Sequence, residues 1–331
     1  MTAYRLYGAQ TSPYSLKVRA CLRYKNVGFE WITRSAATED EFQGHARAPT
    51  VPLLVFPNRP VSQDSTLMLA ALEADFPEPS ATPEDPACQA LAAVLEDYAD
   101  EWLNKAMFRQ RWGQMPDRAA AASRLLVQLF GRNVPKDRQK AERQISSRMM
   151  DRLVLIGADD TNQIILKTSF HRFARLLDAH LKDHLFLFGG KPTAADFALA
   201  AQLQQLLMDP TPAAWLQERA PFVTAWCEFM EDPKAGGPFK SLPELEETLL
   251  PLIRDEVAKT FLPWATANSA SASRRRKKFS VTLEDGIFEQ STQRFAAKSF
   301  KDVKKKVGKA AGDSDSLGKF LEAAGAKSLL L

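Results

Sequence analysis

Residues 6–22 read Leu6-Tyr7-Gly8-Ala9-Gln10-Thr11-Ser12-Pro13-Tyr14-Ser15-Leu16-Lys17-Val18-Arg19-Ala20-Cys21-Leu22. The pattern predicts a short buried strand that ends at Tyr7, a turn over residues 8–11, and a helix that begins at Ser12-Pro13. Serine is a preferred N-cap, and proline fits the first helical position because its missing N–H would have had no partner there. Free N–H groups at a helix start attract an anion, so Ser12 is either a simple cap or part of an anion-binding site.

The length of 331 residues suggests roughly two domains, since domains usually have about 100–200 residues. The residues that follow predict that the first is a compact α/β unit of about 80 residues. Residues 29–32 are interpreted as a second strand and residues 33–48 as a polar connector. Val51-Pro52 directly precedes an apolar strand over residues 53–56, and Val61 begins a short partner strand. Asp64-Ser65 then opens a helix with apolar residues from Leu67 to Phe76.

This arrangement resembles the N-terminal thioredoxin-like domain of glutathione transferases. The resemblance lies in the Ser-Pro-Tyr helix start, the Val-Pro before a strand, and the acidic-Ser pair that opens a later helix. It implies that Val51-Pro52 is a cis peptide, which proline makes accessible, and that the Val51 backbone pairs with the cysteinyl part of glutathione. It also implies that Asp64 and Ser65 hold the γ-glutamyl end, although the family more often has Glu or Gln at position 64.

By the same resemblance, the hydroxyl of Ser12 activates the glutathione thiol, as in serine-type members of the family. Tyr7 is an alternative, because some classes use a tyrosine at the end of the first strand, and Ser15 is a further one. The absence of a cysteine at position 12 argues against thiol–disulfide chemistry.

Four prolines in residues 76–86 mark a linker, and the pattern from residue 87 to residue 262 is helical throughout. Thr193 and Asp196 form a capping box, and with the preceding Phe186-Leu187-Phe188-Gly189-Gly190 it resembles a buried helix start in the family's all-α domain. We therefore expect a glutathione-binding domain over residues 1–80 and an all-helical domain over residues 87–262.

The first long helix of the second domain carries candidate residues for a second-substrate pocket. In the family this substrate lies between the domains, which makes the following residues candidates: Tyr98, Trp102, Met107, Phe108, Arg109 and Trp112. An aromatic stripe at helical spacing is more often part of a core than of a pocket. His180 and His184 lie four residues apart, but no third ligand is close in the sequence, so no metal site is expected.

The last sixty residues predict a folded extension over residues 279–331, of a kind found in some bacterial members of the family. Residues 268–273 are interpreted as a flexible spacer, Asp285-Gly286 as a hairpin turn, and residues 296–307 and 316–326 as helices. The segment from Ser269 onward has 14 Lys/Arg and 7 Asp/Glu, whereas the rest has 30 and 33. The run Arg274–Lys278 is an alternative nucleic-acid or membrane-surface site, but no aromatic residues alternate with its charges, so packing on the body is expected and nucleic-acid binding is not.

The composition is typical of a soluble globular protein, with 45% hydrophobic and 25% charged residues among 331. No basic-then-apolar leader opens the chain and no apolar run approaches the roughly 20 residues that span a bilayer, so a cytoplasmic location without membrane insertion is expected. The three scattered cysteines predict reduced core residues. The sequence thus predicts a homodimeric glutathione transferase that uses glutathione, and no metal, to attack a small hydrophobic electrophile; the alternative is a non-catalytic binding or assembly module with the same fold.

Overall fold

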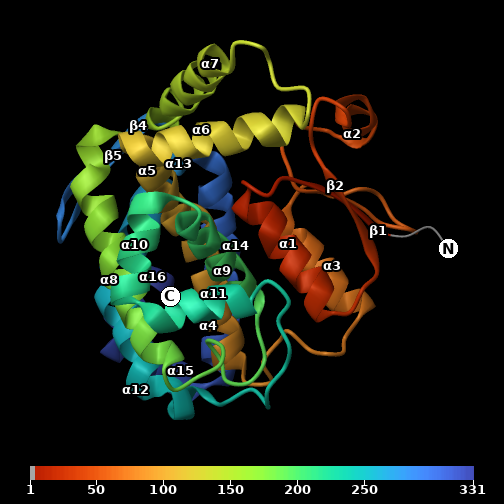
Figure 1. Cartoon of the computed structure of the whole chain (residues 1–331). Coiled ribbons are helices and arrows are strands. Elements are labelled where there is room, and N and C mark those ends of the chain that lie inside the picture. The colour runs from red at the N-terminus through yellow and green to blue at the C-terminus, as the bar shows by residue number, and fades with distance from the viewer. Residues whose placement is uncertain (1–3) are drawn as a thin grey trace.

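The computed structural model describes residues 4–331 and has three parts. A thioredoxin-like domain lies on one side of a larger all-helical domain, and a C-terminal hairpin with helices packs on the helical domain (Figure 1). This is the predicted fold class, and it is confirmed. None of the helices in the described part of the chain is long and apolar enough to cross a membrane.

The thioredoxin-like domain has a mixed sheet of strand order β2-β1-β3. Its elements are β1 (Tyr4–Gly8), α1 (Pro13–Tyr24), β2 (Phe29–Thr33), α2 (Glu39–His45), β3 (Leu53–Val55) and α3 (Ser65–Asp75). β1 pairs parallel with β2 and antiparallel with β3. The partner strand expected from Val61 is reduced to a single bridge between Leu54 and Ser62, because the chain turns there into the start of α3.

Gly8 ends β1 because the backbone there lies against Trp31. A Cβ at this position would lie 2.5 Å from the Trp31 ring, so only glycine fits. Leu6 faces the main core, whereas Tyr7 packs in a separate small cluster with Ile32, Phe42 and Leu53. The two faces of the sheet are therefore both covered, as the alternation of side chains along a strand requires.

The helical domain follows a linker that begins after Phe76. Its helices are α4 (Pro86–Tyr98), α5 (Asn104–Gly113), α6 (Met115–Phe130), α7 (Arg138–Met150), α8 (Gln163–Leu181), α9 (Ala194–Leu207), α10 (Pro210–Arg219), α11 (Pro221–Phe229) and α12 (Leu242–Leu252). Between α4 and α5 the backbone forms a π-helical turn, η1 (Ala99–Leu103), and a second π turn, η4 (Ile253–Val257), follows α12. Such turns often occur at functional sites.

The capping box at the start of α9 is confirmed. The Thr193 N–H donates to Asp196 Oδ2 at 2.8 Å, and the Leu187 N–H donates to Asp196 Oδ1 at 2.9 Å. Burial raises the pKa of Asp196 to about 6. The carboxylate thus joins the loop before α9 to the helix itself, and α9 in turn packs along α1 of the other domain.

The C-terminal extension folds onto the body, as predicted. α13 (Phe261–Ser273) leads from the helical domain to the extension. The extension contains the hairpin β4 (Lys278–Leu283) and β5 (Gly286–Ser291), α14 (Arg294–Asp313), α15 (Asp315–Ala323) and α16 (Lys327–Leu330). α14 packs along α4 through its apolar face, which buries Ala296, Phe300, Val303 and Val307. α14 is longer at both ends than the helix expected over residues 296–307.

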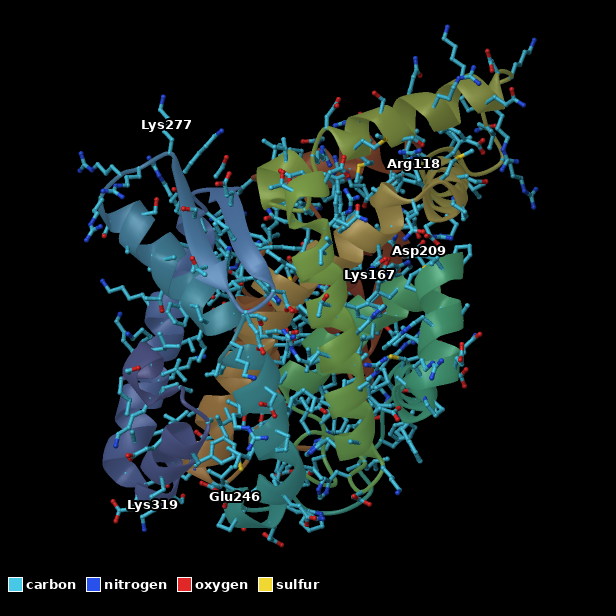
Figure 2. All side chains as sticks on the ribbon, turned by 90° about the vertical axis from the view of Figure 1, so that its left-hand side faces the viewer. Arg118, Lys167, Asp209, Glu246, Lys277 and Lys319 are labelled. Atoms are coloured by element: carbon cyan, nitrogen blue, oxygen red, sulfur yellow. The ribbon has the colours of Figure 1, made fainter. Side chains whose placement is uncertain are left out.

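The spacer expected over residues 268–273 is wrong, because these residues are the last turns of α13. Asn268 is buried: its side-chain amide donates to the Gln293 carbonyl at 2.8 Å and accepts from the Gln293 N–H at 2.8 Å. These tertiary bonds hold a small polar segment in a helix. The basic run Arg274–Lys278 follows at the exposed turn before and at the start of β4, where Lys277 extends away from the body (Figure 2).

Candidate functional site

A cavity of about 670 Å³ lies where the two domains and the extension meet. The thioredoxin-like domain lines it with Tyr14 and with residues 50–52 and 63–67; α4 and η1 contribute Ala93, Glu96, Asp97, Asp100 and Glu101. α14 closes the remaining side with Phe295, Lys298, Ser299, Asp302, Val303 and Lys306. Of the residues expected to hold glutathione, Val51, Pro52, Asp64 and Ser65 all line this one cavity.

Val51 and Pro52 lie on the loop before β3, and their peptide bond is cis. Within residues 4–331, neither the Val51 N–H nor its carbonyl makes a hydrogen bond. Gln63 holds this loop: its Oε1 accepts from the Ala48 N–H at 3.0 Å, and its Nε2 donates to the Thr50 carbonyl at 2.8 Å. The backbone of Val51 is thus held in place with a donor and an acceptor available to a ligand.

Asp64 and Ser65 begin α3. The Asp64 backbone is extended, and its Oδ1 caps the helix by accepting from the Leu67 N–H at 3.2 Å. Ser65 is the first helical residue and is 8% exposed. The first N–H groups of a helix have no partner within it, so this end favours a carboxylate.

Ser12 is the N-cap of α1 and is half-buried. Its Oγ accepts from the Ser15 N–H at 3.3 Å, and within residues 4–331 its own hydroxyl proton has no acceptor. Ser12 does not line the cavity of about 670 Å³ itself; Tyr14, two residues further along α1, does, and its Oη donates to the Asp100 carbonyl at 2.8 Å.

The turn before Ser12 is anchored by the helical domain. The Thr11 N–H donates to Gln128 Oε1 at 3.2 Å, Gln205 Nε2 donates to the Gln10 carbonyl at 2.9 Å, and Arg111 Nη1 reaches the Thr11 carbonyl at 3.4 Å. Arg111 is itself buried and pairs with Asp209 at 2.8 Å. Three helices of one domain therefore fix the turn of the other, and sequence reasoning missed this because the polar partners lie far apart in the chain.

The cavity wall on α4 and η1 is acidic, which sequence reasoning also missed. Lys17, fully buried in α1, donates to Glu96 Oε1 at 2.7 Å and to Asp100 Oδ2 at 2.6 Å. Burial raises the pKa of Asp100 to about 7 in spite of this cation. The signal in the sequence was a set of carboxylates at positions 96, 97, 100 and 101 in an otherwise apolar helix.

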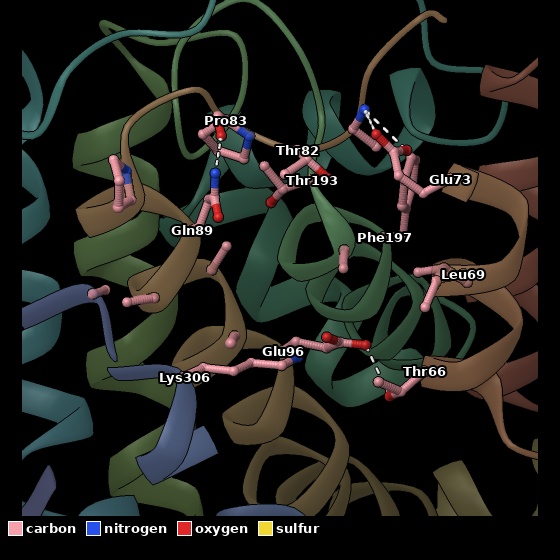
Figure 3. A pocket seen from close by; sticks show the side chains of 18 of the residues that line it. Thr66, Leu69, Glu73, Thr82, Pro83, Gln89, Glu96, Thr193, Phe197 and Lys306 are labelled. Carbon is pink, nitrogen blue, oxygen red and sulfur yellow. Dashed lines mark hydrogen bonds between the residues drawn. The ribbon is translucent and has the colours of Figure 1, made fainter. Parts of the chain in front are cut away.

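A second cavity of about 580 Å³ adjoins the first and shares Thr66, Ala93, Glu96 and Lys306 with it. Figure 3 shows this space between α3, α4, α9 and the end of α14, with Glu96 bonded to the Thr66 hydroxyl at 2.9 Å. Lys306 extends along α4 toward Glu96 in the same view. Glu96 thus forms part of the wall of both cavities.

Comparison with known proteins identifies the family of this fold. Residues 6–80 match the model of the glutathione S-transferase N-terminal domain, and residues 138–229 match the model of its C-terminal domain. The chain belongs to the glutathione S-transferase family.

Two curated plant proteins are similar to parts of this family member. It is 27% identical over 99 residues to glutathione S-transferase U11 of Arabidopsis thaliana, covering 29% of this chain and 42% of that protein. It is 25% identical over 134 residues to the probable glutathione S-transferase GSTU6 of Oryza sativa subsp. japonica, covering 38% and 56%. The chain therefore matches about half the length of these relatives.

Solved structures that are similar to this chain include two bacterial glutathione S-transferases. A glutathione S-transferase from Rhodospirillum rubrum is 19% identical with a TM-score of 0.46, covering 69% of this chain and 87% of that one. One from Methylobacterium radiotolerans, solved with glutathione sulfonate, is 22% identical with a TM-score of 0.41, covering 70% and 92%.

Tyr7, the alternative hydroxyl of this glutathione S-transferase family member, is fully buried in its small cluster beside Phe42. Burial raises the pKa of Tyr7 to about 12, and within residues 4–331 its Oη has no hydrogen-bond partner. Ser15 is fully buried as well, and its Oγ accepts from the Ala9 N–H at 3.3 Å. Of the three hydroxyls, that of Ser12 is the one partly open to solvent.

The aromatic residues considered for a second-substrate pocket lie in the core. Tyr98 and Trp102 are fully buried, with Tyr98 Oη donating to Glu256 Oε1 at 3.1 Å and Trp102 Nε1 donating to Ser169 Oγ at 2.8 Å. Trp112 is 3% exposed, and Phe108 is half-buried against it. None of the four lines the cavity of about 670 Å³, because this face of α4 and α5 packs on α8 and on the extension.

The surroundings of His180, His184 and the three cysteines are as follows. His180 is buried, with Nδ1 2.8 Å from Thr248 Oγ1 and Nε2 3.0 Å from the Leu187 carbonyl oxygen, so both ring nitrogens have partners. His184 Nδ1 lies 3.2 Å from Lys240 Nζ. Cys21, Cys88 and Cys227 are buried and free, as predicted.

Proposed function

We propose that this chain is a serine-type glutathione transferase that binds glutathione in the cavity of about 670 Å³. The observation that carries the proposal is the convergence of Val51, Pro52, Asp64 and Ser65 on one cavity. The Val51 backbone offers one donor and one acceptor, which suits the cysteinyl peptide unit of the ligand. The start of α3 offers free N–H groups for the γ-glutamyl carboxylate, and Asp64 suits its ammonium group.

Ser12 is proposed to stabilise the ionised thiol. Its oxygen accepts from the Ser15 N–H, so its hydroxyl proton is available to a sulfur anion. A hydrogen bond to a charged acceptor is worth about 1.5–3 kcal/mol, and a helix N-terminus adds about 0.3–1 kcal/mol. One pKa unit corresponds to about 1.4 kcal/mol. The pKa of the bound thiol should therefore lie about one to two units below its ordinary value of about 8.5. The thiolate then attacks an electrophilic carbon of a small molecule and displaces its leaving group.

The expectation of a hydrophobic electrophile is not carried into this proposal. It rested on the aromatic residues Tyr98, Trp102, Phe108 and Trp112, which lie in the core, whereas α4 and η1 present carboxylates to the cavity. The proposed reaction is therefore thiolate transfer to a small electrophile that accepts a polar environment.

Calorimetric titration with millimolar glutathione, together with a thermal shift, tests the binding step. Heat and a raised midpoint are expected. No heat and no shift would favour the second candidate, a non-catalytic binding or assembly module, which the position of Ser12 outside the cavity lining also favours.

The Ser12→Ala variant tests the activation step. We expect nearly unchanged glutathione affinity, because Val51, Asp64 and Ser65 remain, with lower thiolate absorbance at neutral pH and lower turnover. Ser241→Ala is the matched control: Ser241 is also an N-cap, at α12, and loses its bond to Glu244 without touching the cavity. Both variants lose about 1 kcal/mol of stability, so unchanged thiolate absorbance in a folded Ser12→Ala protein removes Ser12 from the mechanism.

A further inference from the structure

The acidic wall of the cavity consists of Glu96, Asp97, Asp100 and Glu101, on the end of α4 and on η1. The four side chains come from consecutive turns of the chain and line the same cavity. This wall faces the loop of Val51 and the start of α3 across the cavity. Any molecule that lies beside the Val51 backbone therefore also faces carboxylates.

The cations near the wall, Lys17, Lys105 and Lys306, favour the ionised forms of its other carboxyl groups, and none of them acts on Asp97. Lys17 pairs with Glu96 and Asp100, but Asp97 has only the Ser299 hydroxyl, which donates to its Oδ1. Lys298 and Lys306 of α14 line the same cavity without a salt bridge to the wall among the described residues, although the charge of Lys306 lowers the pKa of Glu96. Two carboxylate oxygens, Asp97 Oδ2 and Asp100 Oδ1, have no hydrogen-bond partner among the described residues.

Of these two residues, Asp97 gives the stronger indication of a missing ligand, because it is buried, with 5% of its surface exposed. A buried carboxylate oxygen without a donor is costly, and native proteins nearly always supply a partner. Burial, and to a lesser extent the neighbouring carboxylates, raise the pKa of Asp97 well above its usual range, so this group ionises readily only when a cation lies beside it. The missing partner is thus a positively charged hydrogen-bond donor.

The partner is better supplied by an organic cation than by a metal ion. Within residues 4–331, no group of three or more His, Cys, Asp or Glu side chains has the geometry to hold a metal. A cavity of about 670 Å³ is within the range of about 300–1,000 Å³ that is usual for small-molecule ligands. An ammonium group has three donors, enough to reach both open carboxylate oxygens.

We propose that the second substrate of this protein carries a protonated amine, whose ammonium group binds Asp97 and Asp100. This inference rests on the proposed function, since it names the substrate class for the same cavity. The acidic wall selects amines over neutral compounds of the same shape and repels carboxylates. Asp97 and Asp100 act as specificity-determining residues.

Calorimetry with three probes of one shape tests this proposal: benzylamine as the cation, benzyl alcohol as the neutral compound, and benzoate as the anion. The titrations use the full chain at pH 8, with and without saturating glutathione. We expect benzylamine to bind about tenfold or more tightly than benzyl alcohol, which is the contribution of one charge-assisted hydrogen bond, and benzoate not to bind. Glutathione should leave the benzylamine affinity within about threefold of its value without glutathione, a difference of under about 1 kcal/mol.

Asp97→Asn keeps the shape of the side chain and removes its charge, so benzylamine should bind this variant no better than benzyl alcohol does. Asp40→Asn, at an exposed position in α2, is the matched control and should leave the preference unchanged. Should Asp97→Asn fail to fold, Asp100→Asn takes its place. The same affinity for benzylamine and benzyl alcohol in the unmodified protein overturns the proposal.

A second result would also overturn the proposal of an amine substrate: competition between glutathione and benzylamine for binding. In that case the acidic wall would bind the ammonium group of glutathione itself. The proposed function is judged separately by the heat of glutathione binding alone. A protein that binds glutathione but shows no preference for the amine retains the function and loses only the substrate class.

Discussion

Replacement of Lys17 by Met tests whether the charges behind the acidic wall support the fold. Lys17 is fully buried, and its ammonium group is the partner of both Glu96 and Asp100. Methionine preserves most of the apolar stem but leaves the two carboxylates without a cation. Removing one partner of a buried ion pair costs about 3–5 kcal/mol, because the remaining charge is desolvated and unpaired. We expect the free energy of unfolding at pH 8 to fall by that amount.

The loss should be smaller at pH 5.5, and the sign follows from Asp100. Its pKa is about 7 in the fold with Lys17 present, against an ordinary value of 3.8, so the folded protein binds the proton more tightly than the unfolded chain. Between these two values, the free energy of unfolding rises as the pH falls. Without Lys17 the pKa of Asp100 rises further, so more of the charge is neutralised at pH 5.5.

Urea unfolding followed by tryptophan fluorescence at both pH values measures this effect. Lys259→Met is the matched control, since the Lys259 side chain is 43% exposed and pairs at the surface with Asp255 at 3.6 Å and Glu284 at 3.3 Å. Such surface pairs contribute about 0–1 kcal/mol. The reasoning is refuted if Lys17→Met is no less stable than the control, or if it loses more stability at pH 5.5 than at pH 8.

Two further predictions concern the helical domain. Gly190→Ala should lower the free energy of unfolding by about 1–3 kcal/mol, because a Cβ there would lie 2.5 Å from the backbone of Gly237. Gly308→Ala in α14, where a Cβ would have nothing within 4 Å, should instead raise it by about 0.5–1 kcal/mol. Equal effects of the two changes in urea unfolding would contradict the packing argument. Burial lowers the pKa of His180 from 6.5 to about 4, so its contribution to stability is complete above pH 6.5 and is lost as the pH falls toward 4. An NMR titration of the imidazole should give a midpoint well below 6.5, whereas an ordinary midpoint would show that His180 is not held neutral by the fold.

Local signals were sufficient to predict the thioredoxin-like domain from the sequence. A capped helix start at Ser12-Pro13 and a proline ahead of a strand each depend on neighbouring residues, and both appear in the structure. The capping box of Thr193 and Asp196 in the helical domain is a local signal of the same kind and is present too. Val51, Pro52, Asp64 and Ser65 could be predicted to lie in one site because the family resemblance supplied the topology of the domain.

The acidic wall could not be predicted in this way. Lys17 and its partners Glu96 and Asp100 lie on different domains, and no local pattern indicates which charges meet. Helical periodicity identified the apolar side of α4 and α5 but not what covers it, so Trp102 was interpreted as a pocket residue while it packs against Phe288 of the extension, with ring centroids 5.1 Å apart. The prediction of a flexible spacer over residues 268–273 was wrong for the same reason, because the helix there is held by hydrogen bonds between Asn268 and the distant Gln293.

The packing of α14 along α4 has a consequence for synthesis of the protein. α4 begins the helical domain, but α14, the helix that covers it, follows α13 and the hairpin and therefore leaves the ribosome much later. Domains generally fold as units while the chain emerges, N-terminal parts first. The apolar side of α4 is therefore uncovered until α14 has been synthesised. Until then the nascent protein exposes to chaperones a surface that α14 covers in the folded protein. A premature stop after α13 would leave that surface of α4 exposed, because α14 would be missing.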